Sequence, residues 1–134
     1  MDRISPEARS ANMKAVRRKD TAPELFVRRM LHAAGYRYRL HRKELPGCPD
    51  IVFVSKKRAI FVHGCFWHGH DCRAGRPPQS RQEYWLPKIA RNRERDVAAV
   101  NSLISSGWKI HVVWECELAD GTDVMNRLKQ FIDS

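Results

Sequence analysis

Two short apolar runs on either side of a polar turn decide most of what this chain can fold into. The runs are Asp50–Val54 and Arg58–His63, and residues 55–57 (Ser-Lys-Lys) separate them. Each run has the length of a β-strand, and a three-residue link of this composition predicts a hairpin. Segments with helical periodicity lie before and after the hairpin. The chain is therefore expected to form an α/β domain with a mixed central sheet flanked by helices.

The segment before the hairpin carries a helix start. Thr21 is expected to cap the helix, Pro23 to lie in its first turn, and Glu24 to occupy the position of a capping-box carboxylate. Gly35 follows the last apolar residues at helical spacing and should end the helix. Tyr36–Leu40 then alternates aromatic or apolar residues with Arg, which predicts an edge strand.

The second half of the chain predicts a helix, a strand and a final helix. The long helix begins near Arg81 or Pro87 and runs to Ser105. Trp108–Trp114 alternates like a strand with one face inward, and this pattern places both of its tryptophans in the core. The buried stripe of the long helix is expected to consist of Ile89, Val97, Val100 and Ile104.

The charge of the chain points to a nucleic-acid partner. Its 134 residues suit one domain, placed at residues 1–134, with 25 Lys and Arg against 15 Asp and Glu. A formal net charge of +10 repels itself unless a polyanion is bound. Residues 1–19 are expected to form a basic arm that this partner orders. No apolar run approaches the roughly 20 residues needed to cross a bilayer. Since the N-terminus does not resemble a secretory signal, a cytoplasmic protein with reduced cysteines and no membrane partner is expected.

Three cysteines and a histidine have the composition of a structural zinc site. Cys65, His70 and Cys72 lie close together, and Cys116 follows the last predicted strand. Thiolates and imidazoles are the ligands of four-coordinate zinc, and the loop after one strand can meet the end of a neighbouring strand at one edge of the sheet. The alternatives are buried free thiols and, with less support, a redox role for Cys65 and Cys72.

Asp50, His63 and His68 favour phosphodiester chemistry. Asp50 opens the first strand of the hairpin and His63 ends the second. A carboxylate at a strand end is a common way for nucleases to hold Mg²⁺, and a neutral imidazole near pH 7 can accept or donate a proton. Two alternatives remain open at this point. Asp50 can be an ordinary turn residue after a proline, and the histidines can be zinc ligands together with His70.

Aromatic and polar residues around the His/Cys loop are candidates for DNA contact. Rings of Phe66, Trp67 and Trp85, if exposed, can stack on bases or wedge into a base step, although large aromatics are usually core residues. Lys88 and Asn92 can supply phosphate contacts from the long helix. A solvated helix face would show the same pattern.

These motifs resemble the very short patch repair endonucleases, bacterial enzymes that nick DNA beside a thymine opposite guanine. The block from Phe61 to Cys72 is long and specific, and the similarity covers about residues 8–118. The matching residues are Ser10–Met13, Asp20–Glu24, Pro46–Asp50, Phe61–Cys72, Trp85, Lys88, Asn92, Glu94–Asp96 and Val113–Cys116.

The resemblance implies a restriction-endonuclease-like core and a catalytic centre at the hairpin. Asp50 and the backbone carbonyl of Val62 would bind Mg²⁺. His68 would activate the attacking water, and His63 would lie near the scissile phosphate and the leaving group. The carboxylates that orient these two imidazoles would be Glu24 and Asp96.

The resemblance also implies a zinc site and a DNA-distorting surface. A T·G wobble pair is easier to unstack and displace than a matched pair, so a wedge of aromatic rings would favour it. Met13 and the N-terminal arm would hold the groove opposite the intercalating rings. The zinc ligands would be Cys65, His70, Cys72 and Cys116. The intercalating residues would be Phe66, Trp67 and Trp85.

The combined expectation is a Mg²⁺-dependent endonuclease with structural zinc that nicks one strand of a duplex 5′ to the thymine of a T·G mismatch. Deamination of 5-methylcytosine produces this mismatch, so cytosine-methylation sites are the expected context. A monomer is expected because an asymmetric mismatch does not require two-fold symmetry, and mismatch-repair and resynthesis proteins are candidate partners. The alternatives are a non-catalytic zinc module that binds distorted DNA and a restriction-like nuclease that cuts a matched site.

Overall fold

The computed structural model describes residues 20–72, 75 and 80–134. The predicted basic arm at residues 1–19, which includes Met13, lies outside the described residues. Among the helices that are described, none has both the length and the apolar character that a membrane crossing requires.

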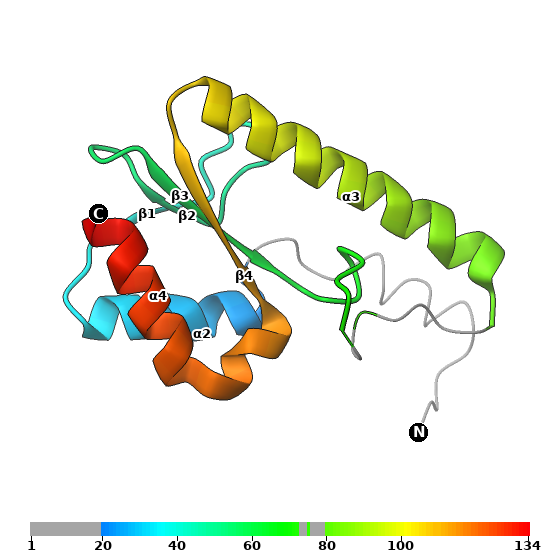
Figure 1. Ribbon diagram of the computed structural model, residues 1–134, viewed down its shortest axis with the longest axis horizontal. Coiled ribbons are helices and arrows are strands. Elements are labelled where there is room, and N and C mark those ends of the chain that lie inside the picture. Colours follow the sequence, from blue (N-terminus) through cyan, green and yellow to red (C-terminus); the bar gives the residue numbers. More distant parts are fainter. Residues whose placement is uncertain (1–19, 73–74, 76–79) are drawn as a thin grey trace.

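A mixed sheet of four strands is formed by the described residues, in the order β1-β2-β3-β4 (Figure 1). The first three strands are antiparallel neighbours, and β4 runs parallel to β3. The predicted hairpin and mixed sheet are therefore confirmed, although the edge strand is shorter than expected. The bounds are Arg39–Leu40 for β1, Ile51–Phe53 for β2, Arg58–His63 for β3 and Lys109–Trp114 for β4.

Helices cover both faces of the sheet. Helices α2 (Ala22–Ala33) and α4 (Gly121–Asp133) lie on one face, and α3 (Gln82–Ser105) crosses the other (Figure 1). A short 3₁₀ helix, η2 (Glu115–Asp120), links β4 to α4 and was not predicted. The main core lies between the sheet and the α2/α4 layer. Its fully buried residues include Val27, Leu31, Ile51, Ile60, Val113, Val124 and Leu128.

The alternation of β3 decides where its last residue lies. Ile60 and Val62 belong to the core beneath α2 and α4. Residues between them point to the opposite face, because successive side chains of a strand alternate. Phe61 lies beside Ala99 of α3, since both would contact a Cβ placed on Gly47. His63 has the same parity as Phe61, so β3 delivers its imidazole to the α3 side of the sheet.

The predicted buried stripe of α3 is wrong at two positions. Ile89 is buried, but Val97 and Ile104 are 61% and 56% exposed. The face of the helix that turns towards the sheet passes instead through Trp85, Ile89, Asn92, Asp96, Ala99 and Leu103. Two of these residues are polar because they contact the loop after β3, so the inward face lacks the continuous apolar pattern by which such faces are predicted.

Trp114 is not a core residue, contrary to the prediction from the strand pattern. Val113 is the residue of β4 that is buried in the α2/α4 core, and Trp114 therefore points to the other face. There its half-buried ring stacks on His70, with 4.1 Å between the ring centroids, and lies edge-on to His63 at 5.2 Å. Trp108 is also only half buried. The strand was predicted correctly, but its inward face was not: Val113, which the alternation places on the outward face, is the residue buried in the main core, and Trp114 lies on the α3 face with the site.

Candidate active site and Cys/His cluster

The loop after β3 is held against α3 by a glycine. Gly69 has φ +61°, and a Cβ at this position would lie 2.7 Å from the Ile89 side chain. Only glycine combines a left-handed backbone with so close an approach to the helix. The loop therefore presents His68 on one side of Gly69 and His70 on the other, and each histidine enters a different cluster.

His63 and His68 form a stacked imidazole pair on the α3 face. Their ring centroids are 3.8 Å apart and their planes differ by 4°. Asp96 from α3 places Oδ2 2.6 Å from His68 Nδ1. Asp96 is thus placed against one of the two predicted imidazoles, and its catalytic role stays a prediction. His63 is buried, and its Nδ1 has no hydrogen-bond partner among the described residues.

The buried position of His63 in this stack keeps its ring uncharged. Burial, together with the neighbouring His68, lowers the pKa of His63 to about 4, so its ring is neutral near pH 7. Ligand atoms of His63, His68 and Asp96 lie within 4.8 Å of one another. However, two parallel rings direct their lone pairs along parallel planes and cannot both point at one ion. This group is therefore better suited to moving protons than to holding a metal.

Asp50 is buried at the start of β2. Its Oδ2 accepts a hydrogen bond from the backbone N–H of Val62, at 2.7 Å. Burial and a contact with the Glu24 carboxyl group raise the pKa of Asp50 to about 7, against the opposing effect of the Val62 N–H. Asp50 and His63 are thus brought to the same end of β3, as the hairpin predicted. The Asp50 side chain is hydrogen-bonded to the backbone of Val62, and the His63 side chain lies on the α3 face.

Glu24 has different partners from those that were expected. Thr21 caps α2 by accepting from the Glu24 N–H at 3.4 Å, as predicted. The Glu24 carboxylate does not complete a capping box. It accepts from the Asp20 N–H at 3.0 Å and from Arg28 at 3.2 Å, and Oε2 lies 2.7 Å from His41 Nε2. The imidazole that Glu24 orients is therefore that of His41 and not that of His63 or His68.

His41 is the site residue that sequence reasoning missed. It follows β1 directly, in a polar stretch with no recognised motif, and only the folded chain brings it to Glu24. A single histidine after a short edge strand carries no local signal. The burial of Glu24, at 1% exposure, is equally invisible in a residue that satisfies the capping-box pattern.

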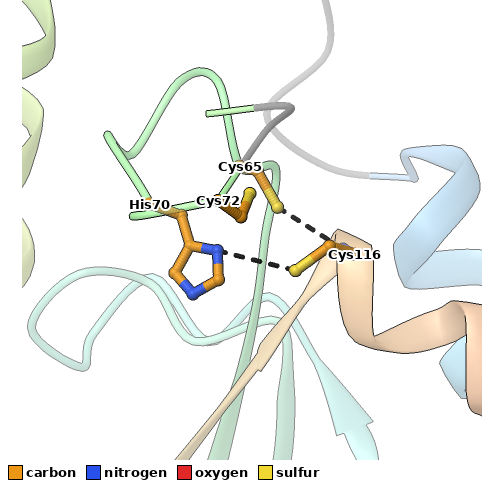
Figure 2. A group of neighbouring side chains, drawn as sticks. All are labelled: Cys65, His70, Cys72 and Cys116. Atoms are coloured by element: carbon orange, nitrogen blue, oxygen red, sulfur yellow. Dashed lines mark hydrogen bonds between the residues drawn. The ribbon is translucent and has the colours of Figure 1, made fainter. Parts of the chain in front are cut away.

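A second cluster joins the loop after β3 to the start of η2. Figure 2 shows the side chains of Cys65, His70, Cys72 and Cys116 turned towards one another. Their ligand atoms lie within 4.8 Å of one another. Cys116 Sγ is 3.6 Å from His70 Nδ1, and the Cys116 N–H donates to Cys65 Sγ at 3.4 Å. The predicted set of four is thus brought together, and it can bind a metal ion.

The aromatic residues of the site form one edge-to-face group. Phe66 lies 5.1 Å from Trp67 and 5.2 Å from Trp85, measured between ring centroids. Phe66 and Trp67 are partly exposed, whereas Trp85 is only 8% exposed. Trp85 therefore packs against the other two rings from the interior of the protein and is not exposed at the surface. This differs from the expectation that all three rings are presented to DNA.

The two polar residues expected to contact phosphates have partners within the protein. Asn92 donates to the backbone carbonyl of Trp67 at 2.8 Å, so it fixes the aromatic part of the loop. Lys88 donates to the Tyr84 hydroxyl at 3.1 Å and lies over the Tyr84 ring. Asn92 therefore has a role inside the protein. Lys88 is half buried, and its ammonium group lies beside Tyr84, next to the aromatic group.

These features fit a hydrolase that acts on phosphodiesters. A mixed sheet flanked by helices is consistent with a nuclease fold, and the end of β3 brings together a buried carboxylate, paired imidazoles and a Cys/His cluster. The chain belongs to the family described as DNA mismatch endonuclease Vsr, whose model matches residues 1–74.

Relatives of known class extend this similarity along the chain. The type II nicking enzyme V.XorIIP of Xanthomonas oryzae is 54% identical over 132 residues, 98% of this chain and 97% of the relative. The type II nicking enzyme V.NmeAIP of Neisseria meningitidis is 41% identical over 131 residues, 98% of this chain and 94% of the relative. The DNA mismatch endonuclease Vsr of Escherichia coli is 43% identical over 110 residues, 82% of this chain and 70% of the relative.

The protein is therefore an endodeoxyribonuclease of DNA mismatch repair, and DNA is its partner. The alternative of a non-catalytic zinc module is set aside, because the relatives over nearly the whole chain are nicking enzymes and a mismatch endonuclease. The net charge of +10, which first indicated a polyanionic partner, is consistent with this class.

Proposed function

We propose that this enzyme nicks one strand of duplex DNA 5′ to the thymine of a T·G mismatch, as a monomer, at sites where 5-methylcytosine has been deaminated. The observation that carries the proposal is the His63–His68 stack with Asp96, together with the buried Asp50, whose carboxylate accepts from the N–H of Val62, the residue before His63. Family membership supports a mismatch as the trigger, and the asymmetry of a T·G pair supports action by one chain.

Asp50 and the Val62 backbone carbonyl are the proposed Mg²⁺ ligands. The residues present fit a hard cation, because Asp50 and Glu24 bring two carboxyl groups together in a buried place where their like charges need compensation. When bound, Mg²⁺ would stabilise negative charge that develops on the cleaved phosphate. Asp50 itself is kept in position by the Val62 N–H, which fixes one carboxylate oxygen.

His68 is proposed to take the proton from the attacking water. Asp96 holds the Nδ1 side of the ring, so Nε2 is the atom that can accept a proton. The carboxylate also stabilises the imidazolium that forms, as the acidic member of a catalytic triad does. His63 is neutral and stacked on His68, and it is proposed to contact the scissile phosphate and the leaving group.

Zn²⁺ is the proposed occupant of the Cys/His cluster. Three thiols and an imidazole are the donor set of a structural zinc site, in which ligand atoms lie roughly 3.5–3.8 Å apart. The 3.6 Å between Cys116 and His70 fits this spacing. The four residues tie the loop after β3 to the start of η2, so they support the segment that carries His68.

Phe66 and Trp67 are proposed to enter the duplex at the mismatch, with Trp85 as their support. Partly exposed rings on a fixed loop can wedge between base pairs, and a T·G pair is displaced more easily than a matched pair. Met13 and the N-terminal arm are proposed to hold the opposite groove. Proteins of mismatch repair and resynthesis are proposed to act after the nick.

Nicking of two matched duplexes tests this function. A T·G duplex and its T·A counterpart are incubated with the enzyme in Mg²⁺ and in EDTA, and strand cleavage is measured. Cleavage of the T·G duplex alone, and only with metal, is expected. Equal cleavage of both duplexes would replace the mismatch assignment with that of a restriction-like nuclease. Asp50→Asn should bind the duplex and not cut it, and His68→Ala should lose turnover with little loss of affinity.

A further inference from the structure

Glu24 is held by two residues whose backbones lie in the left-handed region. Its Oε1 accepts from the N–H of Asp20, where φ is 58°, and its Oε2 meets the ring of His41, where φ is 47°. Asp and His adopt this region more readily than most residues, yet such conformations persist only where surrounding contacts enforce them. Here both uncommon conformations converge on the two oxygens of one buried carboxylate.

His41 is also hydrogen-bonded to Asp50 through its backbone. Its backbone N–H donates to the Asp50 carbonyl at 3.2 Å, directly beyond the paired residues of β1 and β2. The same histidine therefore has its main chain fixed on Asp50 and its side chain fixed on Glu24. Since the Glu24 and Asp50 carboxyl groups contact each other, His41 closes a ring of interactions around them.

We propose that His41 is a positioning residue for DNA cleavage, which holds the Glu24 carboxylate beside Asp50, where both carboxyl groups would supply negative charge to a bound Mg²⁺. The proposal rests on the assignment of Asp50 as a Mg²⁺ ligand. Two buried carboxylates repel each other, and without the His41 ring the Glu24 side chain is held less firmly and can turn away from Asp50. Arg28 is a second partner of Oε2, but its contact is longer, at 3.2 Å.

Three substitutions separate this role from a general effect on folding. His41→Gln keeps an N–H donor at similar reach. His41→Asn tolerates the left-handed backbone and is too short to reach Glu24. His32→Gln replaces an exposed histidine in the last turn of α2 and is the matched control. If His41→Asn does not fold, His41→Met supplies similar length without a donor.

The first measurement is the affinity of the full chain on a T·G duplex for Mn²⁺. Binding is monitored in electron paramagnetic resonance as the loss of the signal of free Mn²⁺. His41→Asn should weaken Mn²⁺ binding by about tenfold, the effect of losing a hydrogen bond to a charged group. His41→Gln and His32→Gln should stay within about threefold of the unchanged chain. In nicking assays at low Mg²⁺, kcat should fall in His41→Asn and recover at high Mg²⁺, with KM for DNA unchanged.

Glu24→Gln completes a double-mutant cycle with His41→Asn. If His41 acts through Glu24, the double variant should bind Mn²⁺ no more weakly than the weaker single variant. Unchanged Mn²⁺ affinity in His41→Asn, or additive losses in the cycle, would overturn the role of His41. Asp50→Asn distinguishes the two proposals. If it still cuts DNA, the proposed metal site is wrong; if it is inactive while His41→Asn behaves normally, only the inference about His41 fails.

Discussion

The buried imidazole of His63 gives the stability of this enzyme a measurable dependence on pH. Burial, with a contribution from His68, lowers the pKa of His63 from its ordinary 6.5 to about 4. The unfolded chain therefore binds this proton more strongly than the folded chain does, and the free energy of unfolding falls as the pH drops from 6.5 towards 4. The full effect of the shift is about 3 kcal/mol, and about 2 kcal/mol of it is lost by pH 5.

Asp50 has the opposite effect over the same range. Burial and the Glu24 carboxyl group raise its pKa from 3.8 to about 7, so the folded chain binds this proton more strongly than the unfolded chain. The resulting stabilisation is complete below pH 3.8 and is lost as the pH rises through 7. The two groups partly cancel, and the effect of His63 is visible only as a difference between a variant and the unchanged chain.

His63→Gln supplies that difference. Urea unfolding at pH 7 and pH 5, with identical metal loading, gives the change in the free energy of unfolding for each protein. The unchanged chain should lose about 2 kcal/mol more than His63→Gln between these two pH values, because only it retains the titrating imidazole. His32→Gln, an exposed control, should follow the unchanged chain. Equal changes, within about 0.5 kcal/mol, would mean that the His63 imidazole is not desolvated as described.

Asp96→Asn should lower kcat by about 10²–10⁴-fold with little effect on DNA affinity, because an amide does not hold His68 in its proton-accepting form; single-turnover nicking checks this, and an unchanged kcat contradicts it. Trp67→Ala should lower the ratio of T·G to T·A nicking more than it lowers duplex affinity, and an unchanged ratio would make Trp67 a packing residue. Cys116→Ser should reduce bound zinc and the midpoint of thermal unfolding, measured by metal analysis and calorimetry, and full zinc content would remove Cys116 from the ligand set.

Features that depend on neighbouring residues in the sequence were predictable. The hairpin follows from two apolar runs and a short turn, and the cap of α2 follows from Thr21 and the residues after it. The set of four possible zinc ligands was also found, because three of them lie in one loop and the fourth follows the parallel strand β4. In each case a local pattern and the rules of sheet topology suffice.

The inward face of α3 was not predictable from apolar spacing. Asn92 and Asp96 lie on that face and bind the loop after β3, so the stripe is interrupted where the helix serves the site. Val97 and Ile104, which continue an apolar pattern, are exposed as a result. A helix that presents polar groups to an active site breaks the rule that links buried positions to hydrophobic ones.

The partners of Glu24 depend on tertiary structure alone. In the sequence, Glu24 three residues after Thr21 satisfies a capping box, and this local explanation hides its burial. His41 reaches it only because β1 pairs with β2 and the chain then turns through a left-handed residue. Nothing within a few positions of either residue specifies this contact.

A carboxylate–imidazole pair lies near the end of β3 on each side of the sheet. Helix α3 brings Asp96 to His68 on one face, and α2, from the layer on the other face, brings Glu24 to His41. The two pairs share no hydrogen-bond partner in the described part of the chain. Losses of nicking rate caused by Asp96→Asn and His41→Asn should therefore multiply, as they do for independent sites. Two substitutions within one pair should not, because the second removes a group whose partner is already lost.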